Sequence, residues 1–177
     1  MKFIITFAKH NQMKYRIVKL TNFSGKEASV YTIKDLSTNE TLFDQFIKNN
    51  LSSSSREIKN ILIRLQTIGN ETGAREHFFK IKEGTLGDGV CALYDKPKSK
   101  LRLYCIRYGM NLIILGNGAP KSKQIRTFQD DDKLTEANYF LRRLSKEIKD
   151  RTTAGEICFT NDGMDLEGNL NFYDDEN

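Results

Sequence analysis

The chain has 177 residues, no tryptophan, 38% hydrophobic and 29% charged residues, a composition typical of one globular domain and not of a disordered chain. It contains three cysteines without metal-ligand spacing, two histidines and no apolar run long enough for a membrane span or a secretory signal, so we expect a cytoplasmic protein without disulfides, metal or cofactor. All 28 lysines and arginines precede residue 152 and seven of the acidic residues follow it, so the basic body indicates a polyanionic partner, although an ordinary solvated surface also fits.

The first part of the chain reads as strands. Runs rich in β-branched and aromatic residues occupy positions 3–7, 15–20 and 30–36, and the polar residues between them favour turns. The first two runs would suit a hairpin. We therefore expect a β-rich N-terminal extension over residues 1–36.

Two short helices are predicted next. Ser37 and Glu40 have the spacing of a capping box ahead of an apolar run. A serine run then interrupts the helical pattern, and Ser54 with Glu57 forms a second capping box before apolar residues at helical spacing. The second helix is expected to end near Gly69.

Three apolar segments with short connections follow at 90–95, 101–109 and 111–118, and they predict an antiparallel meander. The last of them is apolar on both faces, which predicts a central strand. In the middle strand, alternation puts Leu101, Leu103 and Cys105 toward the helices and puts Arg102, Tyr104, Ile106 and Tyr108 on the opposite face.

A final helix is expected from about residues 130–132, where three aspartates favour a helix N-terminus. The acidic segment 152–177 is too apolar for pure disorder, so we expect a short strand or docked extension with a loose acidic end. That end is either solvated or folded over the basic face, where it would mimic a nucleic-acid backbone.

The order helix, helix, meander and helix, together with the segment 79–137 (FKIKEGTLGDGVCALYDKPKSKLRLYCIRYGMNLIILGNGAPKSKQIRTFQDDDKLTEA), resembles the RelE/ParE toxin superfamily. Its HigB-like and phage-derived members are the most similar, and roughly residues 40–150 are covered. The resemblance implies an α+β fold in which an antiparallel β-sheet packs against two N-terminal-side helices and one later helix. It also implies a single domain over residues 1–151, with residues 37–151 as its core.

The function implied by this resemblance is that of a toxin of a type II toxin–antitoxin system, a metal-independent endoribonuclease that cuts mRNA on ribosomes. Its partner would be a cognate antitoxin of the helix-turn-helix type. Some relatives act on DNA gyrase instead, and a catalytically inert RelE-like protein that binds nucleic acid or a partner is the alternative. Arg102 matches the arginine of the family's Tyr-Arg strand, whereas Tyr94 and Asp95 stand where the family has another arginine.

RNA cleavage without a metal needs charge stabilisation at the phosphate together with proton transfer, and arginine or lysine supplies the charge. The resemblance assigns the catalytic role to Arg102, Lys121 and Lys123, the two lysines following a turn predicted at residues 116–120. Residues expected to bind RNA by charge or by stacking are Lys80, Lys82, Tyr104, Arg107, Tyr108 and Arg126.

Each of these residues also has a structural interpretation. Tyrosines alternating along a strand are common β-formers, and Arg102 would equally suit an ordinary surface ion pair. The stretch 101–126 contains no acidic residue, which fits either a site or a solvated loop. His77 precedes two phenylalanines and is expected at the edge of the core more often than as a base.

Overall fold

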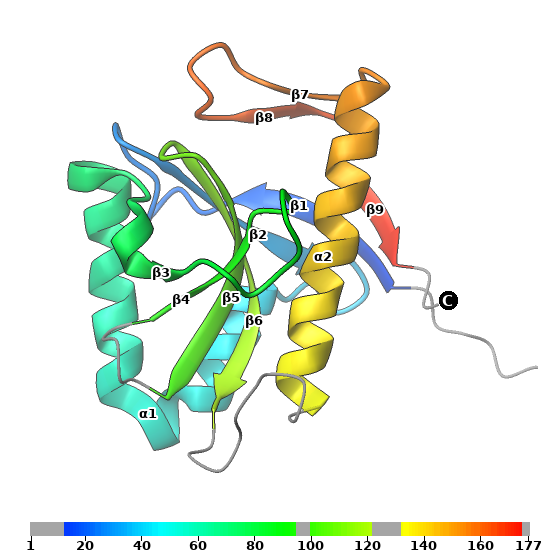
Figure 1. Cartoon of the computed structure of the whole chain (residues 1–177). Helices are drawn as coiled ribbons and strands as arrows, with labels where there is room; N and C mark the ends of the chain where they lie inside the picture. Colours follow the sequence, from blue (N-terminus) through cyan, green and yellow to red (C-terminus); the bar gives the residue numbers. More distant parts are fainter. Residues whose placement is uncertain (1–12, 95–99, 122–131, 175–177) are drawn as a thin grey trace, which may run out of the picture.

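A computed structural model describes residues 13–94, 100–121 and 132–174 of the chain. In these residues, two long helices cover the two faces of a seven-stranded sheet, and a two-stranded hairpin stands at one end (Figure 1). The strands are β1 (Met13–Lys19), β2 (Ser29–Asp35), β3 (Phe79–Lys80), β4 (Val90–Leu93), β5 (Leu101–Tyr108), β6 (Leu112–Pro120), β7 (Ile157–Phe159), β8 (Leu166–Gly168) and β9 (Asn171–Asp174). The helices are α1 (Leu42–Thr67) and α2 (Asp132–Thr153), with short helical turns at Ile68–Thr72 and Glu76–Phe78.

The sheet has the strand order β3-β4-β5-β6-β2-β1-β9. The predicted meander is confirmed as β4, β5 and β6, and β6 is central, with β5 on one side and β2 on the other. The expectation of a purely antiparallel sheet is wrong, because β2 pairs with β6 in parallel. The fold is therefore α+β with a mixed sheet. The strand predicted at positions 3–7 lies outside the described residues.

Helix α1 replaces the two predicted helices and carries the expected break at Ser54, whose φ of −139° and ψ of 36° are not helical. The predicted first capping box is wrong. The Asp35 carboxylate accepts bonds from the backbone and the hydroxyl of Ser37, so Ser37 belongs to a turn. Thr41 caps the helix instead, and its hydroxyl accepts from the Asp44 N–H at 3.0 Å.

Alternation along β5 divides the core into two clusters, as predicted. Leu101, Leu103 and Cys105 belong to the cluster that contains most of the buried apolar residues of α1. Tyr104 and Ile106 belong to the cluster that contains the buried residues of α2. Each face of the sheet is thus packed against a helix. Cys91 and Cys105 are buried free thiols, whereas the free thiol of Cys158 is exposed.

The segment after α2 is part of the folded structure. Strand β9 pairs with β1 and forms an edge of the sheet, and β7 pairs with β8. This agrees with the expected docked strand, and it places β9 at the opposite edge of the sheet from β3. None of the helices in the described part of the chain is long and apolar enough to cross a membrane.

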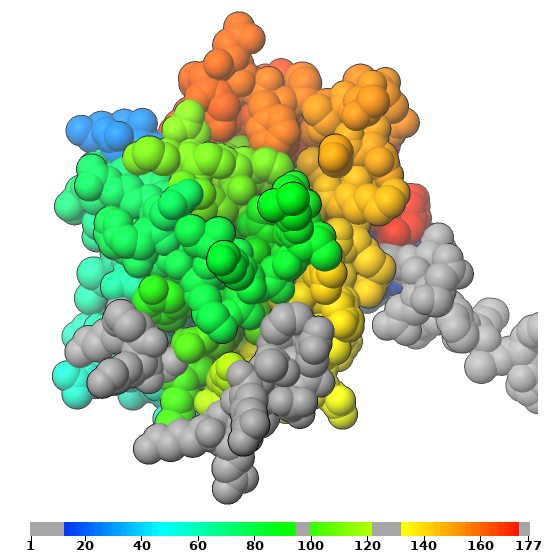
Figure 2. Space-filling model, viewed as in Figure 1, coloured from blue at the N-terminus to red at the C-terminus, as the bar shows by residue number. Residues whose placement is uncertain are grey.

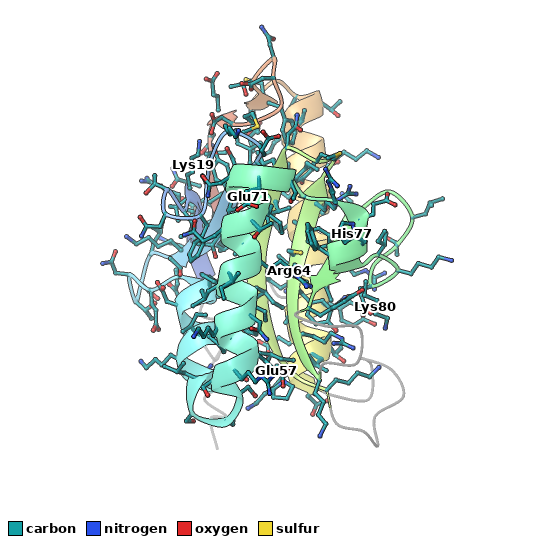
Figure 3. The ribbon with its side chains drawn as sticks, turned by 90° about the vertical axis from the view of Figure 1, so that its left-hand side faces the viewer. Lys19, Glu57, Arg64, Glu71, His77 and Lys80 are labelled. Atoms are coloured by element: carbon teal, nitrogen blue, oxygen red, sulfur yellow. The ribbon has the colours of Figure 1, made fainter. Side chains whose placement is uncertain are left out.

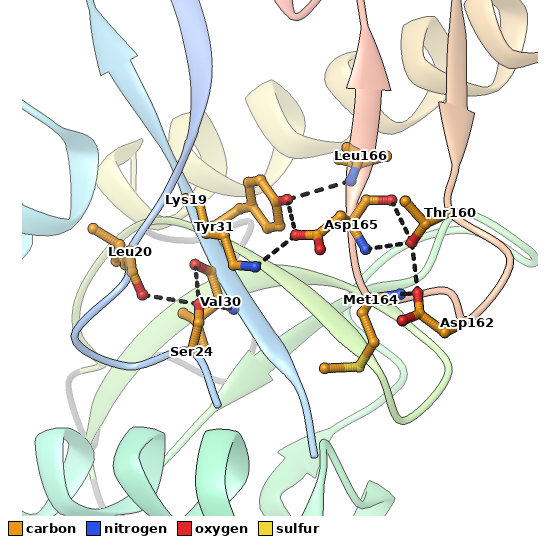
Figure 4. A network of polar contacts seen from close by, with 10 residues as sticks. All are labelled: Lys19, Leu20, Ser24, Val30, Tyr31, Thr160, Asp162, Met164, Asp165 and Leu166. Atoms are coloured by element: carbon orange, nitrogen blue, oxygen red, sulfur yellow. Dashed lines mark hydrogen bonds and ion pairs between the residues drawn. The ribbon is translucent and has the colours of Figure 1, made fainter. Parts of the chain in front are cut away.

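A polar network fastens the β7–β8 hairpin to β1 and β2 (Figure 4). The Asp165 carboxylate accepts from Lys19 Nζ at 2.6 Å and from the Tyr31 hydroxyl at 2.7 Å. The same hydroxyl accepts from the backbone N–H of Leu166 at 3.3 Å. These donors lower the pKa of Asp165, and burial together with the bond to Asp165 raises the pKa of Tyr31 to about 12.

This network predicts pH-dependent stability on both sides of neutrality. Because the folded pKa of Asp165 is lowered, its contribution is present above the ordinary carboxyl pKa and is lost as the pH falls through the folded value. Because the folded pKa of Tyr31 is raised, its contribution is present below pH 10 and is lost as the pH rises toward 12. Urea unfolding against pH should show a weaker acid loss in Asp165→Asn and a weaker alkaline loss in Tyr31→Phe. Wild-type pH profiles in both variants would contradict this.

Candidate nucleic-acid interface

Lys100, Arg102 and Lys121 lie together where β5 begins and β6 ends, and we call this group the basic end. Arg102 pairs across the strands with Ala119, and the backbone N–H of Lys121 donates to the Lys100 carbonyl at 2.7 Å. Arg102 and Lys121, two of the predicted catalytic residues, are therefore neighbours. Lys123, the third, and Arg126 lie outside the described residues.

Tyr94 is the aromatic neighbour of Arg102. The Arg102 guanidinium carbon lies 5.7 Å from the centroid of the Tyr94 ring, which is a cation–π contact. Arg102 is half-buried and also donates from Nη1 to the Leu101 carbonyl at 3.3 Å. A planar guanidinium held beside a ring is well suited to bind a phosphate oxygen while the ring contacts a base.

Two charged side chains of α1 anchor the ends of β4 and β5, and Figure 3 shows them along one side of the helix. Arg64 donates to the carbonyl of Tyr94, and the Glu57 carboxylate accepts from the backbone N–H of Leu101 at 3.1 Å. Glu57 therefore binds a strand end through one of its carboxylate oxygens. Both contacts restrain the backbone at Tyr94 and next to Arg102.

Lys80 and Lys82, which were expected to bind RNA, lie in the edge strand β3 and directly after it. Lys80 Nζ is 2.6 Å from Glu83 Oε1, and the Glu83 side chain is 4% exposed. The Glu83 carbonyl in turn accepts from the buried side-chain amide of Asn138 on α2 at 2.7 Å. Lys80 therefore forms an ion pair with a buried carboxylate while its own side chain stays half exposed, and Lys82 is exposed. His77, labelled in Figure 3, is exposed and packs against the Phe78 ring.

The sheet face that carries Tyr104, a residue expected to bind RNA, is covered. This residue is 1% exposed in the cluster beneath α2, so its ring is not available for stacking on a base. The segment between β3 and β4 adjoins α2 in the space-filling view (Figure 2), and the Ser145 hydroxyl on α2 joins them by donating to the Asp88 carbonyl at 2.6 Å. Tyr108 packs against Phe159, and its burial raises the pKa of its phenol.

Arg107 also has a structural environment. Its Nε donates to the Ala74 carbonyl at 2.6 Å, and Nη1 lies 3.7 Å from the Glu76 carboxylate. The guanidinium also contacts the Phe79 ring on the α1 side of the sheet. Arg107 therefore holds the segment after α1 against β5. Arg102 and Arg107 do not converge on one site, because they lie on opposite faces of β5.

The segment predicted as a glycine-rich turn at residues 116–120 is instead the end of β6. A register shift opposite Tyr104 makes it bulge, since Leu103 pairs with Gly118 and Cys105 with Leu115. The Gly118 N–H donates to its neighbour's side chain, Asn117 Oδ1, at 2.8 Å. This amide is consequently engaged and does not form part of a phosphate-binding turn.

Sequence reasoning missed Tyr94, Glu57 and Arg64 as parts of this region. Tyr94 could have been found, because it stands where the family resemblance expects an arginine. Nothing in the sequence indicates that Glu57 and Arg64 contact this region, since charged residues are common on the exposed side of a helix. Among the described residues, no group of three or more histidine, cysteine or acidic side chains could hold a metal ion.

Comparison of the chain with protein-family models, with curated proteins and with solved structures gives no match.

Proposed function

We propose that the protein is a toxin of a type II toxin–antitoxin system that cleaves mRNA without a metal ion. The observation that carries the proposal is Arg102, held beside Tyr94 and next to Lys121 at the basic end. In this proposal Arg102 stabilises the negative charge that develops on the phosphate when the ribose hydroxyl attacks it. Lys121 contributes a second positive charge to the same phosphodiester backbone.

A second candidate function is binding without catalysis. It is favoured by Tyr94, a residue that stacks on bases but cannot replace the charge of the family's arginine. In this case the protein would hold single-stranded nucleic acid or a partner at the basic end. Both candidates require Arg102, so they differ only in whether the bound RNA is cut.

The two functions are separated by incubating the purified protein with labelled RNA in EDTA. The toxin proposal predicts fragments with 2′,3′-cyclic phosphate ends, because attack by the ribose hydroxyl forms this ring as the chain breaks. Induction in cells should then arrest growth and produce mapped mRNA 5′ ends. RNA that is retained on the protein but stays intact, with and without added ribosomes, would favour the inert alternative.

The proposed partners are mRNA and a cognate antitoxin of the helix-turn-helix type. Co-expression with the product of a neighbouring reading frame that encodes such a protein should restore growth. Inhibition of gyrase supercoiling without RNA cleavage would overturn the ribonuclease proposal and identify a different toxin target.

A further inference from the structure

A cavity, which we call the helix cleft, lies between the first half of α1, the first half of α2 and the end of β6. Its volume is about 330 Å³, within the range of small-molecule sites, and it is lined by residues of α1, α2, β1, β2 and β6. Leu42, Phe140 and Met13 give it an apolar part, and the Phe140 ring packs at 5.2 Å against Tyr15 beneath it. The cleft therefore has an apolar wall formed by the exposed edges of these side chains.

Three side-chain amides line the same cleft: Gln45 and Asn49 on α1, and Asn117 on β6. Asn117 uses only its Oδ1, which accepts from Gly118 at 2.8 Å, so its NH₂ group stays available. Within the described residues, the Gln45 and Asn49 side chains have no hydrogen-bond partner. Gln45 and Asn117 are half-buried and Asn49 is exposed, so a ligand in the cleft can reach all three amides. Amides beside an apolar wall suit a ligand edge that carries hydrogen-bonding groups.

The β6 bulge accounts for the position of Asn117. Two residues, Gly116 and Asn117, lie opposite the single residue Tyr104, so side-chain alternation is interrupted at this point. Bulges turn a side chain away from its regular direction and are frequent beside functional sites. Asn117 consequently lines the cleft together with Gly118, while Ala119 next along the strand pairs with Arg102.

Two cationic and two anionic side chains line the cleft. Lys133 and Arg143 on α2 are exposed cations, and Glu136 on the same helix is an exposed carboxylate. Asp35 also lines it, and the Ser37 bonds that Asp35 accepts lower the pKa of this carboxyl. A ligand with a hydrogen-bonding planar part and one anionic group matches this set, because the cations can pair with the anion and Glu136 can accept from an amino group.

We propose that the helix cleft binds one adenine nucleotide, which on the proposed function is an unpaired nucleotide of the RNA substrate. An amide presents a donor beside an acceptor, which matches the amino group and ring nitrogen of adenine. The exposed edges of Phe140 and Leu42 contact the base, and Lys133 with Arg143 pairs with the phosphate. The cleft and the basic end share β6, so one strand of RNA can contact both.

The test is calorimetric titration of the full chain with AMP, GMP, CMP and UMP, with side-chain amide NMR signals as a second readout. AMP should bind most tightly and shift the Asn117 and Gln45 signals. Asn117→Ala removes the NH₂ donor that Asn117 leaves available, and the loss of this one hydrogen bond should weaken AMP binding roughly two- to tenfold. Ala137→Leu, which fills the cleft without altering an amide, should also weaken it.

Asn161→Ala removes an exposed amide on the β7–β8 turn and is the matched control, with unchanged AMP affinity expected. If Asn117→Ala fails to fold, Gln45→Ala takes its place as the variant that lacks an amide of the cleft. No AMP binding at millimolar concentration, equal binding of all four nucleotides, or cleft variants with wild-type affinity would each overturn the inference. Arg102→Ala should still bind AMP, because Arg102 does not line the cleft. AMP binding therefore tests the cleft proposal independently of RNA cleavage.

Discussion

Replacing Arg102 by alanine is expected to reduce RNA cleavage about 10²–10³-fold, the usual loss when one preorganised group that stabilises transition-state charge is removed. Its guanidinium lies beside Tyr94 at the end of the β5–β6 pair, next to Lys121. Arg102→Lys keeps the charge but loses the planar fork, so an intermediate rate is expected. The measurement is the single-turnover rate on labelled RNA, with circular dichroism to verify folding.

Two other arginines provide controls for this variant. Arg56 is exposed on α1, and Arg56→Ala should cleave at the wild-type rate. Arg107 is on the same strand as Arg102 but bonds the Ala74 carbonyl, so Arg107→Ala should lower the urea midpoint and leave the rate per folded molecule unchanged. Equal rates for Arg102→Ala and wild type would contradict the catalytic role of Arg102, as would a loss of cleavage that only follows unfolding.

Local patterns predicted most of the strands, because side chains alternate wherever one face is buried. The apolar run in β6 correctly indicated a central strand, and alternation in β5 correctly divided Leu103 from Tyr104. The parallel pairing of β2 with β6 was not predictable in the same way. It joins segments about 80 residues apart, and nothing in either strand specifies the direction of its neighbour.

The site was predicted less well than the fold, because exposure depends on what covers a residue. Tyr104 has the sequence pattern of a half-exposed strand tyrosine, yet α2 buries it. Arg107 resembles Arg102 in sequence, but a backbone carbonyl at Ala74 engages it. The N-cap was misplaced for a related reason, since the Asp35 carboxylate competes for the donors of Ser37.

Gly118→Ala is expected to lower the free energy of unfolding by about 3 kcal/mol and to impair cleavage as well. A Cβ at this position would lie 1.8 Å from the Arg102 carbonyl oxygen and 2.8 Å from its carbon, so the backbones of β5 and β6 must separate. The strain falls on the residue that carries the proposed catalytic guanidinium. Urea unfolding followed by circular dichroism gives the stability, and the single-turnover rate gives the second effect.

Gly116→Ala is the matched comparison, two residues earlier in the same strand. A Cβ there would lie 2.9 Å from Leu141 Cδ1 and 3.0 Å from its Cγ, which are side-chain atoms that can shift without moving a neighbouring strand. The cost should therefore be smaller, about 1 kcal/mol, and Arg102 should keep its position. A Gly118→Ala variant as stable as Gly116→Ala would show that the bulge adapts to a side chain. Close contact between the strands would then not be what positions Arg102.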